Sequence, residues 1–251
     1  MLIEKKSDIV FSLIAPAIRT DLYKTFYNSI QKTNIKFEVI FVGYNPPTEE
    51  MPSNFRYIYT KVNPAQCFEI AARNAVGEYL LCVADDLLFP DKFLDRIYFY
   101  LSRLYMDKAL VGNRVQENGV FCDRRLTFNR NCVNSPVIPL MPAFKREVWL
   151  KLGGIDRRFS AVLCDLDMII RFYEAGYTPF VMFDNWVNEI RSDKIISSLY
   201  KKTNRLGRYL NDKFWVKYNE VDKNWFVVKN RMEPVMSFSD IDILTVDQFL
   251  K

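Results

Sequence analysis

The chain has 251 residues, of which 49% are hydrophobic, and its 35 Lys and Arg against 30 Asp and Glu give a formal net charge of +5. This length and apolar content predict one large α/β domain, or one domain with an appendage, and exclude global disorder. No apolar run approaches the length of a membrane span.

The sequence contains no histidine, which excludes nucleophiles activated by Ser-His-Asp or Cys-His pairs. Acid–base chemistry therefore falls mainly to carboxylates. Five cysteines without Cys-x-x-Cys spacing favour a reducing compartment, so we expect a cytoplasmic protein. Lys5 and Lys6 before an apolar run loosely resemble a secretory signal, but Pro16 and Arg19 end that run early.

The first hundred residues alternate between strand and helix patterns. Predicted strands cover residues 9–15, 37–42, 57–59 and 79–83, and predicted helices cover residues 20–30, 64–75 and 93–104. Thr20 and Asn63 are candidate helix N-caps, and Asn63 is followed by Pro64. Gly77 is a candidate for the residue that ends the helix at 64–75. This alternation predicts a mainly parallel sheet with helices on both faces.

The second half is less regular. We predict a strand at 110–112, a hairpin at 115–122 turning at Asn118-Gly119, a polar loop at 124–135, a proline-broken edge strand at 137–141, helices at 145–152 and 165–175, a final strand at 178–183 and helical spacing at 192–210. Residues 191–231 hold eleven Lys and Arg against four Asp and Glu, whereas residues 233–251 hold four acids and one Lys. The sequence thus predicts a basic helical extension with an acidic tail.

The extension is a candidate for peripheral contact with an anionic membrane surface or a glycan, and the alternative is a solvated helix face. We expect no nucleic-acid partner, because the positive charge lies on one short segment.

Two adjacent carboxylates, Asp85 and Asp86, follow the apolar run 79–83 directly. Open α/β sheets bind ligands at the carboxyl ends of their strands, and oxygen-rich sites suit Mg²⁺ or Mn²⁺ with a diphosphate. The alternative is a solvated Asp-Asp turn.

Three segments in this order resemble the family 2 glycosyltransferases with the GT-A fold. They are Ile9 to Pro16 with the helix after it, Asn63 to Pro90 with its Ala-Asp-Asp, and Gly153 to Phe159 continued by Cys-Asp-Leu-Asp at 164–167. The resemblance covers roughly residues 8 to 190. It implies a GT-A (Rossmann-like), mixed but mainly parallel sheet flanked by helices, with residues 1–190 as the catalytic domain and residues 191–251 as the C-terminal extension.

The resemblance implies a nucleoside-diphosphate sugar as donor, with Mn²⁺ or Mg²⁺ on its diphosphate. Asp86 matches the metal-binding aspartate of the family. Ala84 stands where the family often has an acidic residue that contacts the ribose, which leaves Asp85 as the candidate substitute. Pro16 and Arg19 match the loop that borders the nucleotide.

Two further residues are candidate contacts to the nucleoside base. Arg73 matches the family arginine near the base, and its alternative is an ion pair with Glu69 on the same helix. Tyr44 follows the second strand, where the family often has a base-reading aspartate. It is a candidate to stack on the base, or it caps the sheet.

The remaining candidates concern catalysis and the metal. Asp165 matches the general base of inverting family members, and its alternative role is to cap its helix. The family commonly supplies a late histidine to the metal, and this chain has none. Asp184, Asn185 or Asn188, after the last predicted strand, or water, is the candidate replacement.

The resemblance implies an inverting glycosyltransferase of the hexosyltransferase type (EC 2.4). It would move a sugar to a hydroxyl of a glycan or lipid-linked acceptor. The alternative is a non-catalytic protein on the same fold that binds sugar nucleotides or glycans, with Ala84, Cys164 and the missing histidine as its signs.

Overall fold

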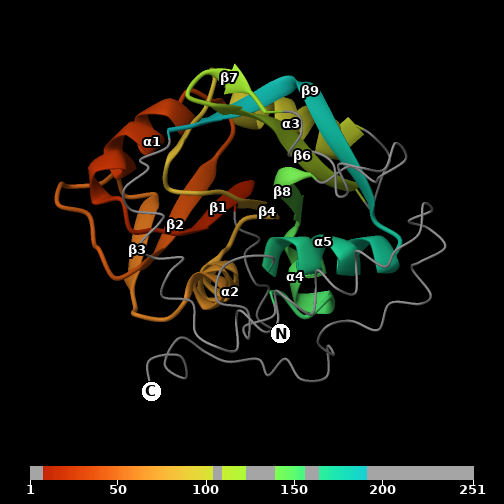
Figure 1. Cartoon of the computed structure of the whole chain (residues 1–251), viewed down its shortest axis with the longest axis horizontal. Coiled ribbons are helices and arrows are strands. Elements are labelled where there is room, and N and C mark those ends of the chain that lie inside the picture. The colour runs from red at the N-terminus through yellow and green to blue at the C-terminus, as the bar shows by residue number, and fades with distance from the viewer. Residues whose placement is uncertain (1–7, 104–108, 123–138, 156–163, 191–251) are drawn as a thin grey trace.

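The computed structural model describes residues 8–103, 109–122, 139–155 and 164–190 (Figure 1). The polar loop predicted at 124–135 and the extension predicted at 191–251 lie outside the described residues. In the described ranges, no helix combines the length and the apolar character needed to cross a bilayer.

Strands and helices alternate through most of this region. The elements up to residue 103 are β1 (Phe11–Pro16), the 3₁₀ turn η1 (Thr20–Leu22), α1 (Tyr23–Ile30), β2 (Phe37–Gly43), β3 (Phe55–Tyr59), α2 (Pro64–Asn74), β4 (Tyr79–Cys82), β5 (Leu87–Leu88) and α3 (Phe93–Arg103). The later elements are β6 (Ala109–Glu117), β7 (Val120–Phe121), β8 (Leu140–Lys145), α4 (Arg146–Lys151), α5 (Cys164–Glu174) and β9 (Thr178–Glu189).

The described strands form one mixed sheet in the order β3-β2-β1-β4-β8-β6-β9-β5, with β7 paired to β6. The first four strands in this order are parallel, and β6 runs parallel to β9. In contrast, β8 and β5 run antiparallel to their neighbours. The predicted α/β class and mixed sheet are confirmed.

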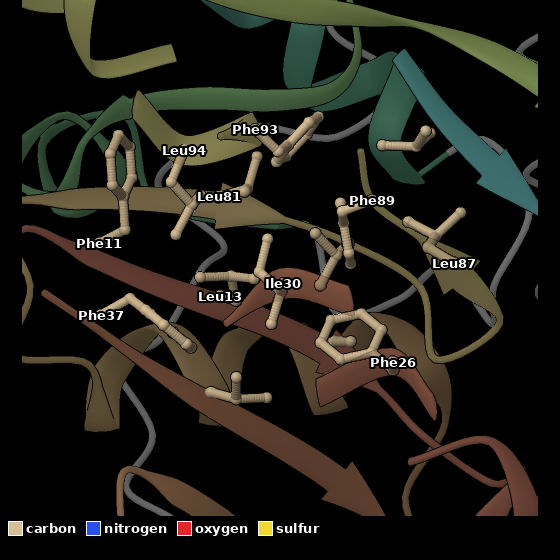
Figure 2. Packing of buried hydrophobic residues seen from close by; sticks show 14 of the residues in the cluster. Phe11, Leu13, Phe26, Ile30, Phe37, Leu81, Leu87, Phe89, Phe93 and Leu94 are labelled. Carbon is tan, nitrogen blue, oxygen red and sulfur yellow. The ribbon is translucent and has the colours of Figure 1, made fainter. Parts of the chain in front are cut away.

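Helices cover both faces of this sheet, as predicted. In Figure 1, α1 and α3 lie on one side of the strands and α2, α4 and α5 on the other. Alternate strand residues supply the two cores: Leu13 and Leu81 face α1 and α3, whereas Ile14 and Leu80 face α2, α4 and α5. Figure 2 shows the first of these cores, in which Phe26 of α1 and Phe93 of α3 both contact the ring of Phe89.

The predicted edge position of the strand at 137–141 is wrong, and residues 137 and 138 lie outside the described residues. Strand β8 begins at Leu140 and lies inside the sheet, between β4 and β6. A proline is tolerated there because Pro142 lies opposite an irregularity in β6, between Val111 and Asn113, and beyond the residues of β8 that pair with β4. The prolines thus indicated an edge strand, but the irregular pairing between β6 and β8 leaves room for Pro142 inside the sheet.

The cap predictions had mixed outcomes. Asn63 caps α2 in a reciprocal capping box with Gln66, as its position before Pro64 indicated. Thr20 is not an N-cap, because it lies inside η1 and α1 begins only at Tyr23. The hairpin at Asn118-Gly119 is confirmed, with the positive φ values (49° and 86°) that a type I′ turn requires.

Gly77 does not end α2, which stops at Asn74. It marks instead a close approach between the chain before β4 and strand β1. Its N–H donates to Ser12 Oγ at 2.9 Å. A Cβ on Gly77 would lie 2.7 Å from the backbone nitrogen of Ser12, so only glycine fits without a shift of the backbone.

We expect Gly77→Ala to lower the free energy of unfolding by about 1–3 kcal/mol, because the added methyl overlaps backbone atoms of a buried strand. Urea unfolding followed by far-UV circular dichroism measures this change. The neighbouring Val76→Ala is the control, since Val76 is 48% exposed, and its change should stay within about 0.5 kcal/mol. Equal effects of the two substitutions would contradict the close-approach explanation.

Candidate active site

The carboxyl ends of the adjacent strands β1 and β4 bring an arginine onto two buried carboxylates. The N–H groups of Ile18 and Arg19 donate to Asp85 Oδ2 at 2.6 and 2.8 Å. Arg19 Nη1 donates to Asp85 Oδ1, and Arg19 Nη2 lies 3.1 Å from Asp86 Oδ2. We call Arg19, Asp85 and Asp86 the Arg19–carboxylate cluster. Both aspartate side chains are only 2% exposed, which excludes a solvated Asp-Asp turn.

The cluster carries an excess of negative charge, since two carboxylates face one guanidinium. Burial raises the pKa of Asp86 to about 6, and the charge of Arg19 opposes that rise. Burial by itself lowers the pKa of Arg19, but Asp85 and Asp86 outweigh it and the net pKa is raised. The guanidinium therefore stays protonated and paired with the two carboxylates.

One oxygen of the cluster suits a metal ion. Asp86 Oδ1 is buried and has no hydrogen-bond partner among the described residues. The described residues contain no group of three or more His, Cys, Asp or Glu placed to hold a metal together. Magnesium is nonetheless often held by one or two carboxylates together with substrate phosphates and water. Asp86 fits a cation of that kind, whose other ligands would be diphosphate oxygens and water.

The loops after β1 and β2 pack backbone to backbone beside the cluster. A Cβ on Gly43 would lie 2.0 Å from the carbonyl oxygen of Ala17. Asn45 Nδ2 donates to the carbonyl oxygen of Ile18 at 2.8 Å. The two loops therefore hold each other in place next to Asp85.

Tyr44 lies between the two anchoring residues of the second loop and is 40% exposed. Pro16, the last residue of β1, pairs with Val42 and fixes the point where both loops leave the sheet. The structure thus gathers Pro16, Arg19, Tyr44, Asp85 and Asp86 at one edge of the sheet. Tyr44 presents an aromatic surface there, of the kind on which bases stack.

Asp165 lies on α5, which packs on the face of the sheet that Ile14 and Leu80 supply. It is the second residue of that helix and is exposed to solvent. Burial raises the pKa of the Cys82 thiol, and the charge of Asp165 adds to this rise. Cys82 is the last residue of β4, three positions before Asp85, so the charge of Asp165 acts on this strand.

Arg73 is engaged within its own helix. Its Nε donates to Glu69 Oε1 at 2.6 Å, the ion pair that was its alternative reading. Glu69 is 1% exposed, and its other oxygen accepts from Trp149 Nε1 at 2.8 Å and from the N–H of Ile155 at 3.3 Å. Arg73 thus belongs to a buried network that joins α2 to the segment after α4.

Asp184 is not gathered with the cluster. It lies inside β9 rather than after the last strand, and it accepts hydrogen bonds from the hydroxyl of Tyr100 on α3 at 3.2 and 3.3 Å. The residue that contacts Asp86 is Ile190, which follows β9 directly and lies six residues after Asp184. Its N–H donates to the carbonyl oxygen of Asp86 at 2.8 Å. The described contacts of Asp184 are therefore to α3 and not to the cluster.

The other two amide candidates in β9 also have structural partners. Asn185 is fully buried and bonds to Arg96 and Asn113, whereas Asn188 Oδ1 accepts from the N–H of Gly119 at 2.8 Å. Neither forms a described contact with Asp86.

Sequence reasoning missed Glu189, the last residue of β9. Its register partner is Leu87, next to Asp86, and its charge contributes to the raised pKa of both Asp86 and Arg19. The sequence signal was weak, because the register of β9 shifts between Met182 and Trp186 and interrupts the strand pattern. The strand was therefore predicted to end at residue 183.

The architecture is that of the GT-A-like fold of glycosyltransferases. The same fold is seen in S. aureus TarS, a family 2 glycosyltransferase. The TarS 1-349 complex with UDP aligns with a TM-score of 0.59 at 14% identity, over 85% of this chain and 73% of that one. The complex with UDP-GlcNAc aligns with a TM-score of 0.60 at 16% identity, over 76% and 61%.

A longer TarS structure aligns with a TM-score of 0.60 at 13% identity, over 90% of this chain but only 46% of that one. No family model and no curated protein sequence matches this chain. The resemblance predicted from the sequence is thus confirmed at the level of the fold.

We expect Asp85→Ala to lower the free energy of unfolding by about 2–4 kcal/mol, because it leaves two backbone N–H groups without their acceptor and removes one of the two carboxylates that pair with Arg19. Chemical denaturation measures this loss. Asp91→Ala is the matched control: its ion pair with Lys32 joins side chains that are 73% and 59% exposed, and its loss should cost at most about 0.5 kcal/mol. A small effect at Asp85 would show that the loop after β1 holds its position without it.

Proposed function

We propose that this chain is an inverting glycosyltransferase that moves a sugar, of the hexosyl type, from a nucleoside-diphosphate sugar to an acceptor hydroxyl. The observation that carries the proposal is the Arg19–carboxylate cluster at the carboxyl ends of β1 and β4. The fold supports it, because TarS shares that fold and has been crystallised with UDP and with UDP-GlcNAc. Residues 1–190 are proposed as the catalytic domain and residues 191–251 as an extension.

Donor binding is assigned to the loops at this edge of the sheet. Tyr44 would stack on the base, and Asp85 would hold the loop that borders the nucleoside through the backbone of Arg19. Asp86 would hold Mn²⁺ or Mg²⁺ through its unpaired oxygen. When bound, this cation offsets the negative charge that builds on the departing diphosphate.

The chemistry needs one base. The acceptor hydroxyl attacks the anomeric carbon from the face opposite the diphosphate, and its proton passes to the Asp165 carboxylate. The new carbon–oxygen bond forms as the bond to the diphosphate breaks, which inverts the anomeric configuration. The exposure of Asp165 at the start of α5 supports this role, because an acceptor must reach the base from solvent.

A thermal-shift panel of nucleoside diphosphates, with and without Mn²⁺, tests donor binding. A ligand at one hundred times its Kd stabilises the folded state by about 2.7 kcal/mol, which for a chain of this size raises Tm by roughly 5–10 °C. We expect one base to give the largest shift, and Mn²⁺ to increase it. Asp86→Ala should abolish the Mn²⁺-dependent part, and a panel without any shift would refute the proposed donor class.

Turnover separates the enzyme from a non-catalytic binding protein. With the donor named by that panel, we expect Asp165→Asn to lower kcat for transfer or donor hydrolysis by about 10²–10⁴ with little change in donor affinity, because the isosteric amide cannot accept the proton. Asp91→Asn, at an exposed aspartate away from the cluster, is the control. Nucleotide binding without turnover by the unsubstituted chain would favour the binding protein.

A further inference from the structure

Arg19 occupies most of the oxygen atoms that a divalent cation would use. Both oxygens of Asp85 accept hydrogen bonds, from Arg19 Nη1 and from the N–H groups of Ile18 and Arg19. Asp86 Oδ2 faces Arg19 Nη2 at 3.1 Å, which leaves Asp86 Oδ1 as the one cluster oxygen without a described partner. An incoming cation thus meets a permanent positive charge beside the oxygen it needs.

The backbone and the side chain of Arg19 are held differently. Asp85 Oδ2 fixes the backbone, and Asn45 fixes the preceding carbonyl oxygen of Ile18. The two carboxylates pair with the guanidinium, the charge of Glu189 acts on it as well, and its Nε is buried without a described hydrogen-bond partner. Rotation about side-chain torsions would therefore move the charge while the loop stays in place.

A diphosphate offers the guanidinium an alternative partner. Arginine forms bidentate hydrogen bonds with phosphates as it does with carboxylates. The phosphates of a donor would lie at this edge of the sheet. Exchange of one anionic partner for another leaves the guanidinium paired throughout. The carboxylate oxygens that it releases become available to a metal ion.

We propose that Arg19 is a built-in counter-ion that competes with the divalent cation for Asp86, so that metal binds tightly only together with a diphosphate that draws the guanidinium away. This inference rests on the proposed function, which puts the metal and the diphosphate at this cluster. It adds that the empty site discriminates against free metal, and that one side chain couples the two ligands.

Binding of Mn²⁺ alone, measured by the electron paramagnetic resonance signal of the free ion, tests the competition without any turnover. We expect Arg19→Gln to bind Mn²⁺ about tenfold more tightly, or better, than the unsubstituted chain in the absence of nucleotide, because a nearby positive charge is removed. The double variant Arg19→Gln with Asp86→Asn should lose this gain. UDP should strengthen Mn²⁺ binding more in the unsubstituted chain than in Arg19→Gln.

Two further variants serve as a substitute for Arg19→Gln and as a charge control. Arg19→Gln with Asp85→Asn keeps the charge of the cluster and the acceptor for the two N–H groups, so it tests the same competition if Arg19→Gln alone unfolds. Arg56→Gln removes an equal charge from an ion pair with Glu38 near the amino ends of the strands, and it should leave Mn²⁺ binding unchanged.

The outcomes separate the inference from the proposed function. If UDP strengthens Mn²⁺ binding through Asp86 but neither Arg19 variant binds free Mn²⁺ more tightly, the counter-ion role is overturned and the metal–diphosphate site stands. If neither Arg19 variant nor the unsubstituted chain binds Mn²⁺, with or without UDP, both fall. A gain of the same size in Arg56→Gln would reduce the effect to net charge and also overturn the inference.

Discussion

The carboxylate of Asp85 is the contact on which this edge of the molecule depends. A single buried side chain accepts two backbone N–H groups from the loop after β1 and a guanidinium from the same loop. Because the donors lie 66 and 67 residues away in sequence, the bond joins two strand ends that are neighbours only in the folded sheet. An unpaired buried carboxylate would be strongly unfavourable, so the loop and the aspartate must form their contacts together.

The rest of the site is arranged around this contact by backbone packing rather than by further charges. The loop after β2 approaches through Gly43 and is fastened by Asn45, and the end of β9 reaches Asp86 through the N–H of Ile190. On the other face of the sheet, Glu69 ties α2 to Trp149 and to the segment at Ile155. A scaffold fastened in this way would suit the flexible, highly charged donor that we propose.

Local chemistry made much of the fold predictable, and long-range contacts decided what was missed. The capping box at Asn63 and the turn at Asn118-Gly119 were readable because each depends on a few adjacent residues. The sequence also identified the acidic pair at 85–86, since two carboxylates after an apolar run are unusual. Three features depend on partners far along the chain, which periodicity does not reveal. They are the interior position of β8, the close approach of Gly77 to β1 and the position of Glu189 opposite Leu87.

The exposed ring of Tyr44 has a consequence for how such a molecule changes over time. The residues on either side of it, Gly43 and Asn45, carry the contacts that fasten the loop, whereas the tyrosine itself is 40% exposed. Replacement at this one position would therefore alter the surface that this edge of the sheet offers to the nucleoside we propose, while the contacts of the loop remain. If Tyr44 contacts the base as proposed, base preference could change during evolution at this position without loss of the fold.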